Sequence, residues 1–124
     1  MSKNENYLKK ANFCLLVYDI TEKKSFEEIK DYFFEKLKEK CQKDIIIFLI
    51  GNKSDLFDKR KVTTEEAIAF AYINHLFYFE TSCFKNYENI KYIFDIISSN
   101  ILNGKMINHK KLKNHKKRRD RCFY

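Results

Sequence analysis

Three runs of hydrophobic residues along the chain each have the length of a β-strand. They are residues 12–20 (NFCLLVYDI), 44–50 (DIIIFLI) and 76–80 (LFYFE). The hydrophobic positions within each run are nearly continuous instead of alternating with polar ones, so both faces of each strand are expected to be buried. This pattern is typical of a parallel sheet that is covered by helices.

Between and after these runs, hydrophobic residues recur at the spacing of helices. Capping boxes, in which a hydroxyl and an acidic side chain satisfy free N–H groups, mark the start of two of the predicted helices. The boxes are formed by Ser25 with Glu28 and by Thr63 with Glu66, and the helices are expected to run to about Lys40 and Asn74. A third helix is expected to begin near Tyr87.

The hydrophobic stripe of each predicted helix is expected to face the core. The three stripes are Phe26, Ile29, Phe33 and Leu37; Ala67, Phe70 and Ala71; and Ile90, Ile93, Phe94, Ile97 and Ile101. Strands and helices alternate three times, which calls for parallel strands joined by right-handed crossovers. We therefore expect an α/β fold with three parallel strands and three helices.

The net charge of the chain is concentrated at its C-terminal end. The chain has 124 residues, is 44% hydrophobic and carries a net charge of +8, and its length suits one domain. Residues 1–102 hold equal numbers of basic and acidic residues, whereas residues 103–124 hold nine basic residues and only one acidic residue, Asp120. We expect a neutral domain over 1–102 and a disordered or helical basic tail over 103–124.

Several functional classes are not indicated by the composition. No run reaches the ~18 apolar residues of a membrane span, and the first ten residues do not resemble a signal peptide, so a cytoplasmic protein is expected. The four cysteines are scattered without a C-x-x-C pair, which favours neither a zinc site nor a disulfide framework. No metal site is expected at His75, His109 or His115 either.

Polar residues follow the three predicted strands, at the edge of a parallel sheet where ligands bind. These loops are residues 19–24, 51–61 and 81–87. Asp55 can accept two adjacent N–H donors, and the aliphatic part of Lys53 can lie flat on a ring. Guanine, unlike adenine, offers a ring N–H beside an exocyclic amine, so these residues favour a guanine site. Asp19 is instead expected to stabilise the turn that ends its strand.

Two motifs resemble the base-recognition sequences of small GTPases. GNKSDL (51–56) resembles the family's N-K-x-D motif, and ETSCF (80–84) resembles its second base-contacting motif, usually E-T-S-A-K. Residues 7–33 and 62–71 are also similar to Rab-type members of the Ras superfamily. The resemblance covers about residues 7–102 and only the C-terminal portion of the family domain, so the fold it implies is an incomplete P-loop-NTPase-like domain.

The resemblance implies roles for five residues in binding the guanine of GTP or GDP. Asn52 would orient the loop and contact the purine N7, Lys53 would pack over the ring, and Asp55 would accept the N1–H and 2-amino groups. The backbone N–H groups of Ser82 and Cys83 would donate to O6. Cys83 stands where the family commonly has alanine, which is a mild change because only the backbone takes part.

Two further features depart from the family pattern. Phe84 stands in place of a lysine that covers the base, which weakens base recognition without abolishing it. The only glycines are Gly51 and Gly104, so the chain contains neither G-x-x-x-x-G-K-[ST] nor D-x-x-G, the sequences that hold the phosphates and Mg²⁺. We therefore expect no GTP hydrolysis by these 124 residues, no Mg²⁺ site, and nucleotide affinity of roughly millimolar or weaker.

The resemblance implies that a complete form acts as a GTP-dependent switch in vesicle traffic. An alternative is a non-catalytic module that targets a membrane or binds a protein. Residues 105–121 would bind an anionic membrane surface, placing the protein peripherally on intracellular membranes, and Cys122 is a candidate for lipidation although it lies third from the C-terminus. Strand 12–20 would bind a protein partner at its open edge. Nucleic-acid binding by the tail is the least favoured alternative.

Overall fold

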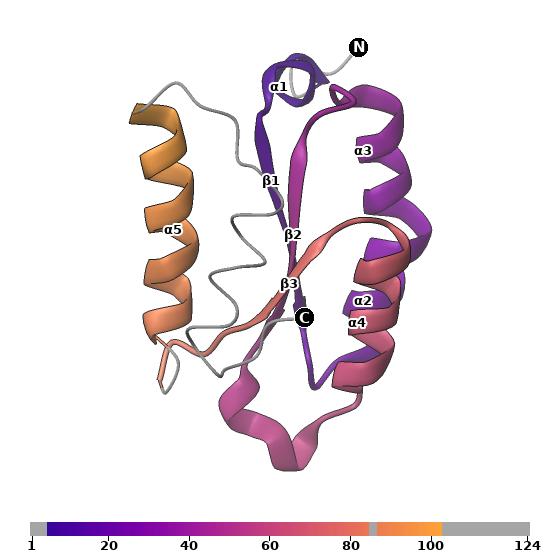
Figure 1. Ribbon diagram of the computed structural model, residues 1–124. Coiled ribbons are helices and arrows are strands. Elements are labelled where there is room, and N and C mark those ends of the chain that lie inside the picture. Colours follow the sequence, from indigo (N-terminus) through magenta and orange to yellow (C-terminus); the bar gives the residue numbers. More distant parts are fainter. Residues whose placement is uncertain (1–4, 85–86, 103–124) are drawn as a thin grey trace.

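The computed structural model describes residues 5–84 and 87–102, and its centre is a three-stranded parallel sheet (Figure 1). The strands are β1 (Phe13–Asp19), β2 (Ile46–Asn52) and β3 (Phe77–Glu80), in the spatial order β1-β2-β3. Both strand pairs are parallel, so the predicted sheet is confirmed.

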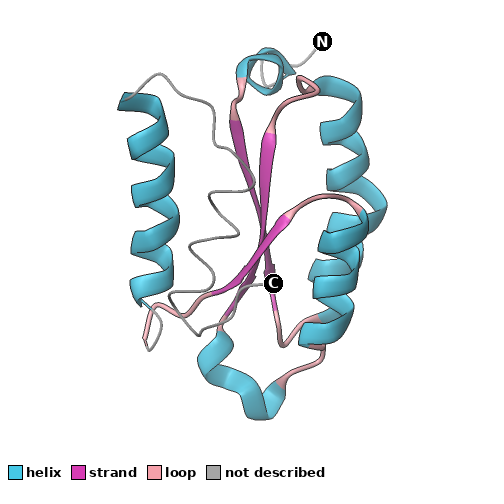
Figure 2. Ribbon diagram, in the orientation of Figure 1, coloured by secondary structure: helices cyan, strands magenta, loops and turns pink. Residues whose placement is uncertain are grey.

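Helices cover both faces of the sheet, as Figures 1 and 2 show. The helices α2, α3 and α4 lie on one face, and α5, which follows β3, lies on the other. The helices are α1 (Glu5–Lys10), α2 (Lys23–Glu28), α3 (Phe34–Lys40), α4 (Thr64–Ile73) and α5 (Tyr87–Leu102), with a π-helix η1 (Ile29–Phe33) between α2 and α3 and a 3₁₀ helix η2 (Ser54–Lys59) after β2. The predicted alternation is confirmed, whereas α1 and η2 were not predicted from the sequence.

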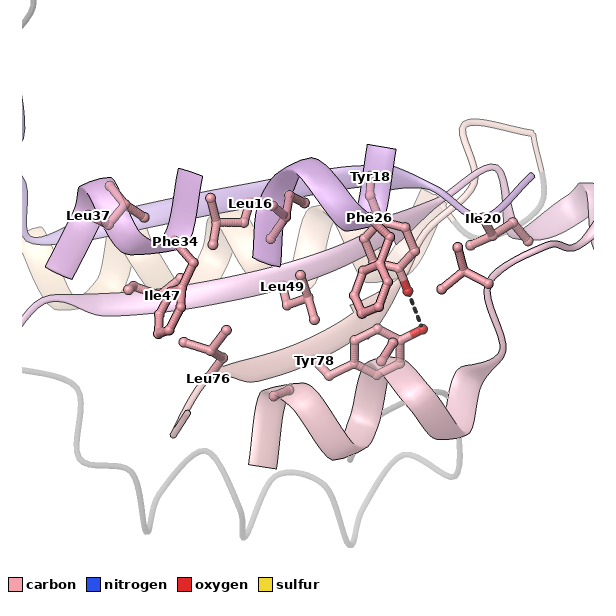
Figure 3. Close-up of a cluster of buried hydrophobic side chains, with 14 residues drawn as sticks. Leu16, Tyr18, Ile20, Phe26, Phe34, Leu37, Ile47, Leu49, Leu76 and Tyr78 are labelled. Atoms are coloured by element: carbon pink, nitrogen blue, oxygen red, sulfur yellow. Dashed lines mark hydrogen bonds between the residues drawn. The ribbon is translucent and has the colours of Figure 1, made fainter. Parts of the chain in front are cut away.

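The larger hydrophobic core lies between the sheet and α2, α3 and α4 (Figure 3). Side chains at alternate positions of β1 and β2 enter it, because successive residues of a strand point to opposite faces. Its fully buried members include Ile20, Phe26, Leu49, Ala67 and Ala71. Leu8 of α1 also packs against this core, so α1 lies next to α3.

The smaller core lies between α5 and the opposite face of the sheet. Ile46, Phe48 and Ile50 of β2 enter it, and Ile93 is the buried contribution of α5. Phe94, the next residue, is 53% exposed, so the prediction that it belongs to the hydrophobic stripe was wrong. The stripe instead includes neighbouring residues that share one face of the helix with Ile93: Tyr92, Ile96 and Ile97.

A π-turn shifts the hydrophobic stripe between α2 and α3 by one residue. The N–H of Phe34 donates to the carbonyl of Ile29, five residues earlier, instead of to the carbonyl four residues earlier. As a result Phe34 is buried at 5% exposure and Phe33 is 47% exposed. The prediction that Phe33 faces the core was therefore wrong.

The two predicted capping boxes have different outcomes. Thr63 is the N-cap of α4, where its hydroxyl oxygen accepts the N–H of Glu66 at 3.1 Å, so this helix start is confirmed. The predicted box at Ser25 and Glu28 was wrong, because α2 begins earlier, after Glu22. The Ser25 hydroxyl instead donates to the carbonyl of Glu22 at 2.6 Å, inside the first turn.

The basic tail and Cys122 lie outside the described residues. Within the described residues, no helix combines the length and the apolar character needed to cross a membrane.

Candidate functional site

The carboxyl ends of the three strands lie together at one end of the sheet, at the bottom of Figure 1. Asp19 at the end of β1 is in register with Asn52 at the end of β2, and Gly51 is in register with Glu80 of β3. The residues that follow each strand therefore meet at this edge, as the sequence predicts.

Lys53 crosses from the loop after β2 to the end of β1. Its Nζ lies 2.8 Å from Oδ2 of Asp19, and its backbone is left-handed with φ of 63°. Burial raises the pKa of Asp19, but hydrogen bonds from Lys53 and Thr21 outweigh it, so the pKa is lowered overall. Both donors of Thr21 reach Oδ1 of Asp19, at 2.8 and 2.7 Å, and confirm that Asp19 stabilises the turn.

Asp55 is joined to the loop after β3 by a chain of two hydrogen bonds. The Ser82 hydroxyl donates to Oδ1 of Asp55 at 2.7 Å, and the backbone N–H of Phe84 donates to the same Ser82 oxygen at 3.1 Å. Ser82 is fully buried while Asp55 is partly exposed. The carboxylate is therefore held by the loop after β3, and Asp55 as a whole is only partly buried.

Backbone and side-chain bonds fix the two loops against each other. Thr81 donates its N–H to the carbonyl of Gly51 at 2.9 Å and its hydroxyl to Oδ1 of Asn52 at 3.1 Å. The Ser54 N–H donates in return to the carbonyl of Thr81 at 3.0 Å. Asn52 is thus a structural bridge between the loops, whatever else its amide contacts.

Gly51 has no side chain, and the ring of Tyr18 packs against it. A Cβ at this position would lie 2.8 Å from the hydroxyl oxygen of Tyr18, closer than such atoms approach, and 3.1 Å from Cγ2 of Ile20, which is a tight contact. The φ of Gly51 is not in the left-handed region, so backbone conformation does not explain the glycine. Close packing does.

A buried network of hydrogen bonds and one ion pair surrounds Glu80, the last residue of β3, and it was not predicted from the sequence. Arg60 donates two hydrogen bonds to the carboxylate of Glu80, at 2.7 and 3.0 Å. The hydroxyls of Tyr78 and Thr64 donate to Oε1 of Glu80 at 2.7 and 2.9 Å. Tyr78 also bonds to Tyr18 across the sheet at 3.1 Å (Figure 3).

The charge of Glu80 is stabilised although its side chain is buried. Burial raises its pKa, but the bonds from Arg60, Tyr78 and Thr64 outweigh this and lower the pKa overall. One feature of the sequence could have indicated this ion pair: Glu80 is an acidic residue at the end of an otherwise apolar strand. A carboxylate that is buried there needs a cationic partner. Its partner, 20 residues away, follows no local spacing.

The structure brings the five candidate residues to the same edge of the sheet. Asn52, Lys53 and Asp55 come from the end of β2 and η2, and Ser82 and Cys83 follow β3. Cys83 is exposed, as is the neighbouring Phe84 at 89%. Among residues 5–84 and 87–102, no group of three or more histidine, cysteine or acidic side chains could hold a metal ion.

Comparison with known sequences identifies similar proteins over most of the chain. A model of the family described as "Ras family" matches residues 2–103. The Ras-related protein RabQ of Dictyostelium discoideum is 40% identical over 97 residues, which are 78% of this chain and 47% of that protein. The Ras-related protein RABA4a of Arabidopsis thaliana is 42% identical over 106 residues, 86% of this chain and 45% of that protein.

The name of a third relative includes GTP. The GTP-binding protein ypt3 of Schizosaccharomyces pombe is 40% identical over 95 residues, which are 77% of this chain and 44% of that protein. The chain thus spans slightly less than half the length of each of these relatives.

Proposed function

Because the chain belongs to the Ras family, we propose that the loops at the carboxyl end of its sheet bind the base of a guanine nucleotide. The observation that carries this proposal is the Asp55 carboxylate, which the buried Ser82 hydroxyl holds at 2.7 Å in a residue that is only partly buried. A carboxylate fixed in this way is preorganised to accept two adjacent N–H groups.

The residues present fit guanine by the chemistry of their donors and acceptors. Asp55 would accept the N1–H and the 2-amino group, and the backbone N–H groups of Ser82 and Cys83 would donate to O6. The Lys53 ammonium is engaged by Asp19, which fixes the aliphatic part of its side chain at the site, where it would pack over the ring. Asn52 would contact N7 while it bridges the loops.

The phosphates of the nucleotide would need residues that this sequence does not contain. With only two glycines, the 124 residues lack the glycine-rich loop that wraps phosphates in such proteins. The chain alone would therefore bind the base with roughly millimolar affinity and would not hydrolyse GTP. In a complete form, of the length of the relatives, the protein would be a GTP-dependent switch in vesicle traffic.

The experiment is a nucleoside titration that is followed by ¹H–¹⁵N spectra of the chain. Guanosine is expected to shift the resonances of the loops after β2 and β3, and adenosine at the same concentration is not. The Asp55→Asn variant should lose guanosine and gain xanthosine, because an amide N–H can donate to the carbonyl that replaces the 2-amino group. Equal shifts by guanosine and adenosine would contradict the proposal.

A second candidate function is membrane attachment by the tail, and the distribution of charge favours it. Residues 103–124 hold nine basic residues against one acidic residue, and each basic residue near an anionic leaflet contributes about 1 kcal/mol. Residues 105–121 would bind the surface, and lipidation of Cys122 would strengthen the attachment. Flotation with vesicles that contain phosphatidylserine tests this: binding should fall with salt, and removal of residues 103–124 should abolish it.

A further inference from the structure

Phe84 brings an aromatic ring to the candidate base site. Its backbone N–H donates to the hydroxyl oxygen of Ser82 at 3.1 Å, and the same hydroxyl donates to Oδ1 of Asp55 at 2.7 Å. The backbone that carries the ring is therefore only two hydrogen bonds away from the carboxylate that would hold the base. The Phe84 side chain is 89% exposed, so a ring bound at Asp55 can reach it.

The backbone at Phe84 is fixed, although its side chain is exposed. On one side of Ser82, Thr81 is bonded to Gly51 and to the side chain of Asn52. On the other side, the N–H of Phe84 is bonded to the Ser82 hydroxyl, and Ser82 itself is fully buried. A contact with the Phe84 ring therefore costs mainly the ordering of one short side chain, which loses less conformational entropy than a lysine would.

Phe84 and Lys53 approach Asp55 from opposite sides of β2, which lies between β1 and β3. The ammonium of Lys53 is bonded to Asp19 at the end of β1. Phe84 follows β3, and Figure 1 shows the segment after β3 turning toward α5, away from the end of β1. A flat ring at Asp55 would therefore have Lys53 on its β1 side and Phe84 on its β3 side.

We propose that the Phe84 ring stacks on the face of the bound guanine that Lys53 leaves free, an inference that rests on the proposed base site. Every base has a π face, so stacking adds affinity without reading the hydrogen-bonding edge of the base. Phe84 and Asp55 therefore have separate roles. The ring strengthens the binding of a base at the site, and the carboxylate selects guanine. Stacking takes the place of the polar contacts that a lysine at this position would make.

The first experiment compares binding of guanosine 5′-monophosphate by the 124-residue chain and by three variants, with ¹H–¹⁵N spectra as the readout. Phe84→Ala is expected to weaken binding about fivefold or more, because it removes the stacked ring. Phe84→Tyr keeps an aromatic ring and should bind within about twofold of the unmodified chain. The matched control is Phe57→Ala, which removes a 69% exposed phenylalanine from the neighbouring loop and should leave binding unchanged.

The second experiment detects the contact by fluorescence. The chain contains no tryptophan, so Phe84→Trp introduces a single indole. Guanosine 5′-monophosphate should quench its fluorescence saturably, with the same midpoint as the shifts of the loop resonances, because the base stacks on the indole. Tyr72→Trp, at a 69% exposed position on α4, is the control and should show only gradual collisional quenching. Adenosine 5′-monophosphate should quench both variants in this gradual way, because Asp55 does not hold adenine.

Three outcomes would overturn the stacking role alone. They are unchanged binding by Phe84→Ala, equal losses in Phe84→Ala and Phe84→Tyr, and quenching of Phe84→Trp that does not saturate. In each of these cases the base site still stands if guanosine 5′-monophosphate shifts the loop resonances of the unmodified chain and adenosine 5′-monophosphate does not. If neither nucleotide shifts them, or if both do so equally, the proposed base site is wrong and the stacking role fails with it.

Discussion

Among single residues, Ser82 is the one on which the geometry of the candidate base site most depends. Its hydroxyl holds Asp55 at 2.7 Å and accepts the N–H of Phe84. Ser82→Ala is expected to weaken guanosine binding by about tenfold, because the carboxylate loses the donor that fixes it. Cys83→Ala is the matched control, since the proposed contact uses only the backbone N–H. Spectra of both variants with guanosine measure the difference, and an equal loss in the two would contradict this role.

Glu80 provides a pH-dependent test of the buried network. Its folded pKa lies below the ordinary value of 4.5, so its contribution to the free energy of unfolding is full above about pH 4.5. That contribution is lost as the pH falls through the lowered folded pKa. Glu80→Gln is expected to cost about 3 kcal/mol at pH 7, because it leaves Arg60 without its carboxylate partner.

Chemical unfolding of both proteins between pH 7 and pH 3 measures this effect. The difference in free energy should be constant near neutrality and should shrink below about pH 4.5, because Glu80 of the unfolded wild-type chain then binds a proton while the folded carboxylate stays ionised down to its lowered pKa. Asp19, whose pKa is also lowered, titrates in both proteins and cancels in the difference. A difference that stays constant down to pH 3 would show that the charge of Glu80 is not what stabilises the fold.

The residues of the candidate site could be located from the sequence, but the network beneath them could not. Asn52, Lys53 and Asp55 follow a clear apolar run, so their place at the edge of a parallel sheet follows from the strand pattern. Arg60 and Glu80 become partners only through the tertiary fold. Their spacing matches neither a helix nor a hairpin, so no local rule connects them.

Within the helical elements, the π-turn decides which of two adjacent aromatic residues enters the core. Phe34→Ala is expected to cost about 3–5 kcal/mol, because it empties a buried site. Phe33→Ala should cost less than about 1 kcal/mol, since the side chain is half exposed. Denaturant unfolding of the two variants measures the costs. Equal costs, or a larger cost at Phe33, would show an uninterrupted α-helix.

The sequence alone could not distinguish these alternatives. Both Phe33 and Phe34 are hydrophobic, so spacing from Ile29 to Leu37 is compatible with either one in the stripe. Phe34 is selected by packing, because its ring contacts Phe70 of α4 with 5.5 Å between ring centroids. Such contacts between helices that are distant in the sequence are not visible in a local pattern.

The end of α4 gives a second prediction for an element. His75 has a left-handed backbone with φ of 58°, and the N–H of the next residue, Leu76, donates to the carbonyl of Ala71 at 2.8 Å. This is the geometry of a helix end that favours glycine. His75→Gly is expected to stabilise the fold by about 0.5–1 kcal/mol, whereas His75→Ala should not. Thermal unfolding of both variants tests this, and stabilisation by alanine would contradict the explanation.

For the molecule as a whole, the alternation of strands and helices was sufficient to predict the fold. It did not predict the asymmetry of the fold, which is the unequal distribution of helices over the two faces of the sheet. Three hydrophobic runs and the stripes between them correctly indicated three parallel strands with helices on their faces. The sequence did not show that α2, α3 and α4 share one face while α5 alone covers the other. The side of each crossover depends on the order of the strands in the sheet, which no single segment determines.

This asymmetry predicts where the folded chain opens most readily. The core beneath α2, α3 and α4 includes fully buried residues from all three strands, whereas the core beneath α5 is smaller and contains one buried residue of that helix, Ile93, among the described residues. Amides of α5 should therefore exchange with solvent at a lower opening free energy than those of β2. Native-state hydrogen exchange in low concentrations of denaturant measures both free energies.

A variant separates local opening of α5 from unfolding of the whole sheet. Ile93→Ala removes the anchor of α5 and is expected to lower the opening free energy of that helix by about 2–4 kcal/mol. The amides of α4, which pack against the other face, should change less, because α5 can detach while the larger core remains closed. If α4 and α5 lose equal protection in this variant, the two faces of the sheet unfold as one cooperative unit. In that case the smaller core contributes as much to the integrity of the domain as the larger one.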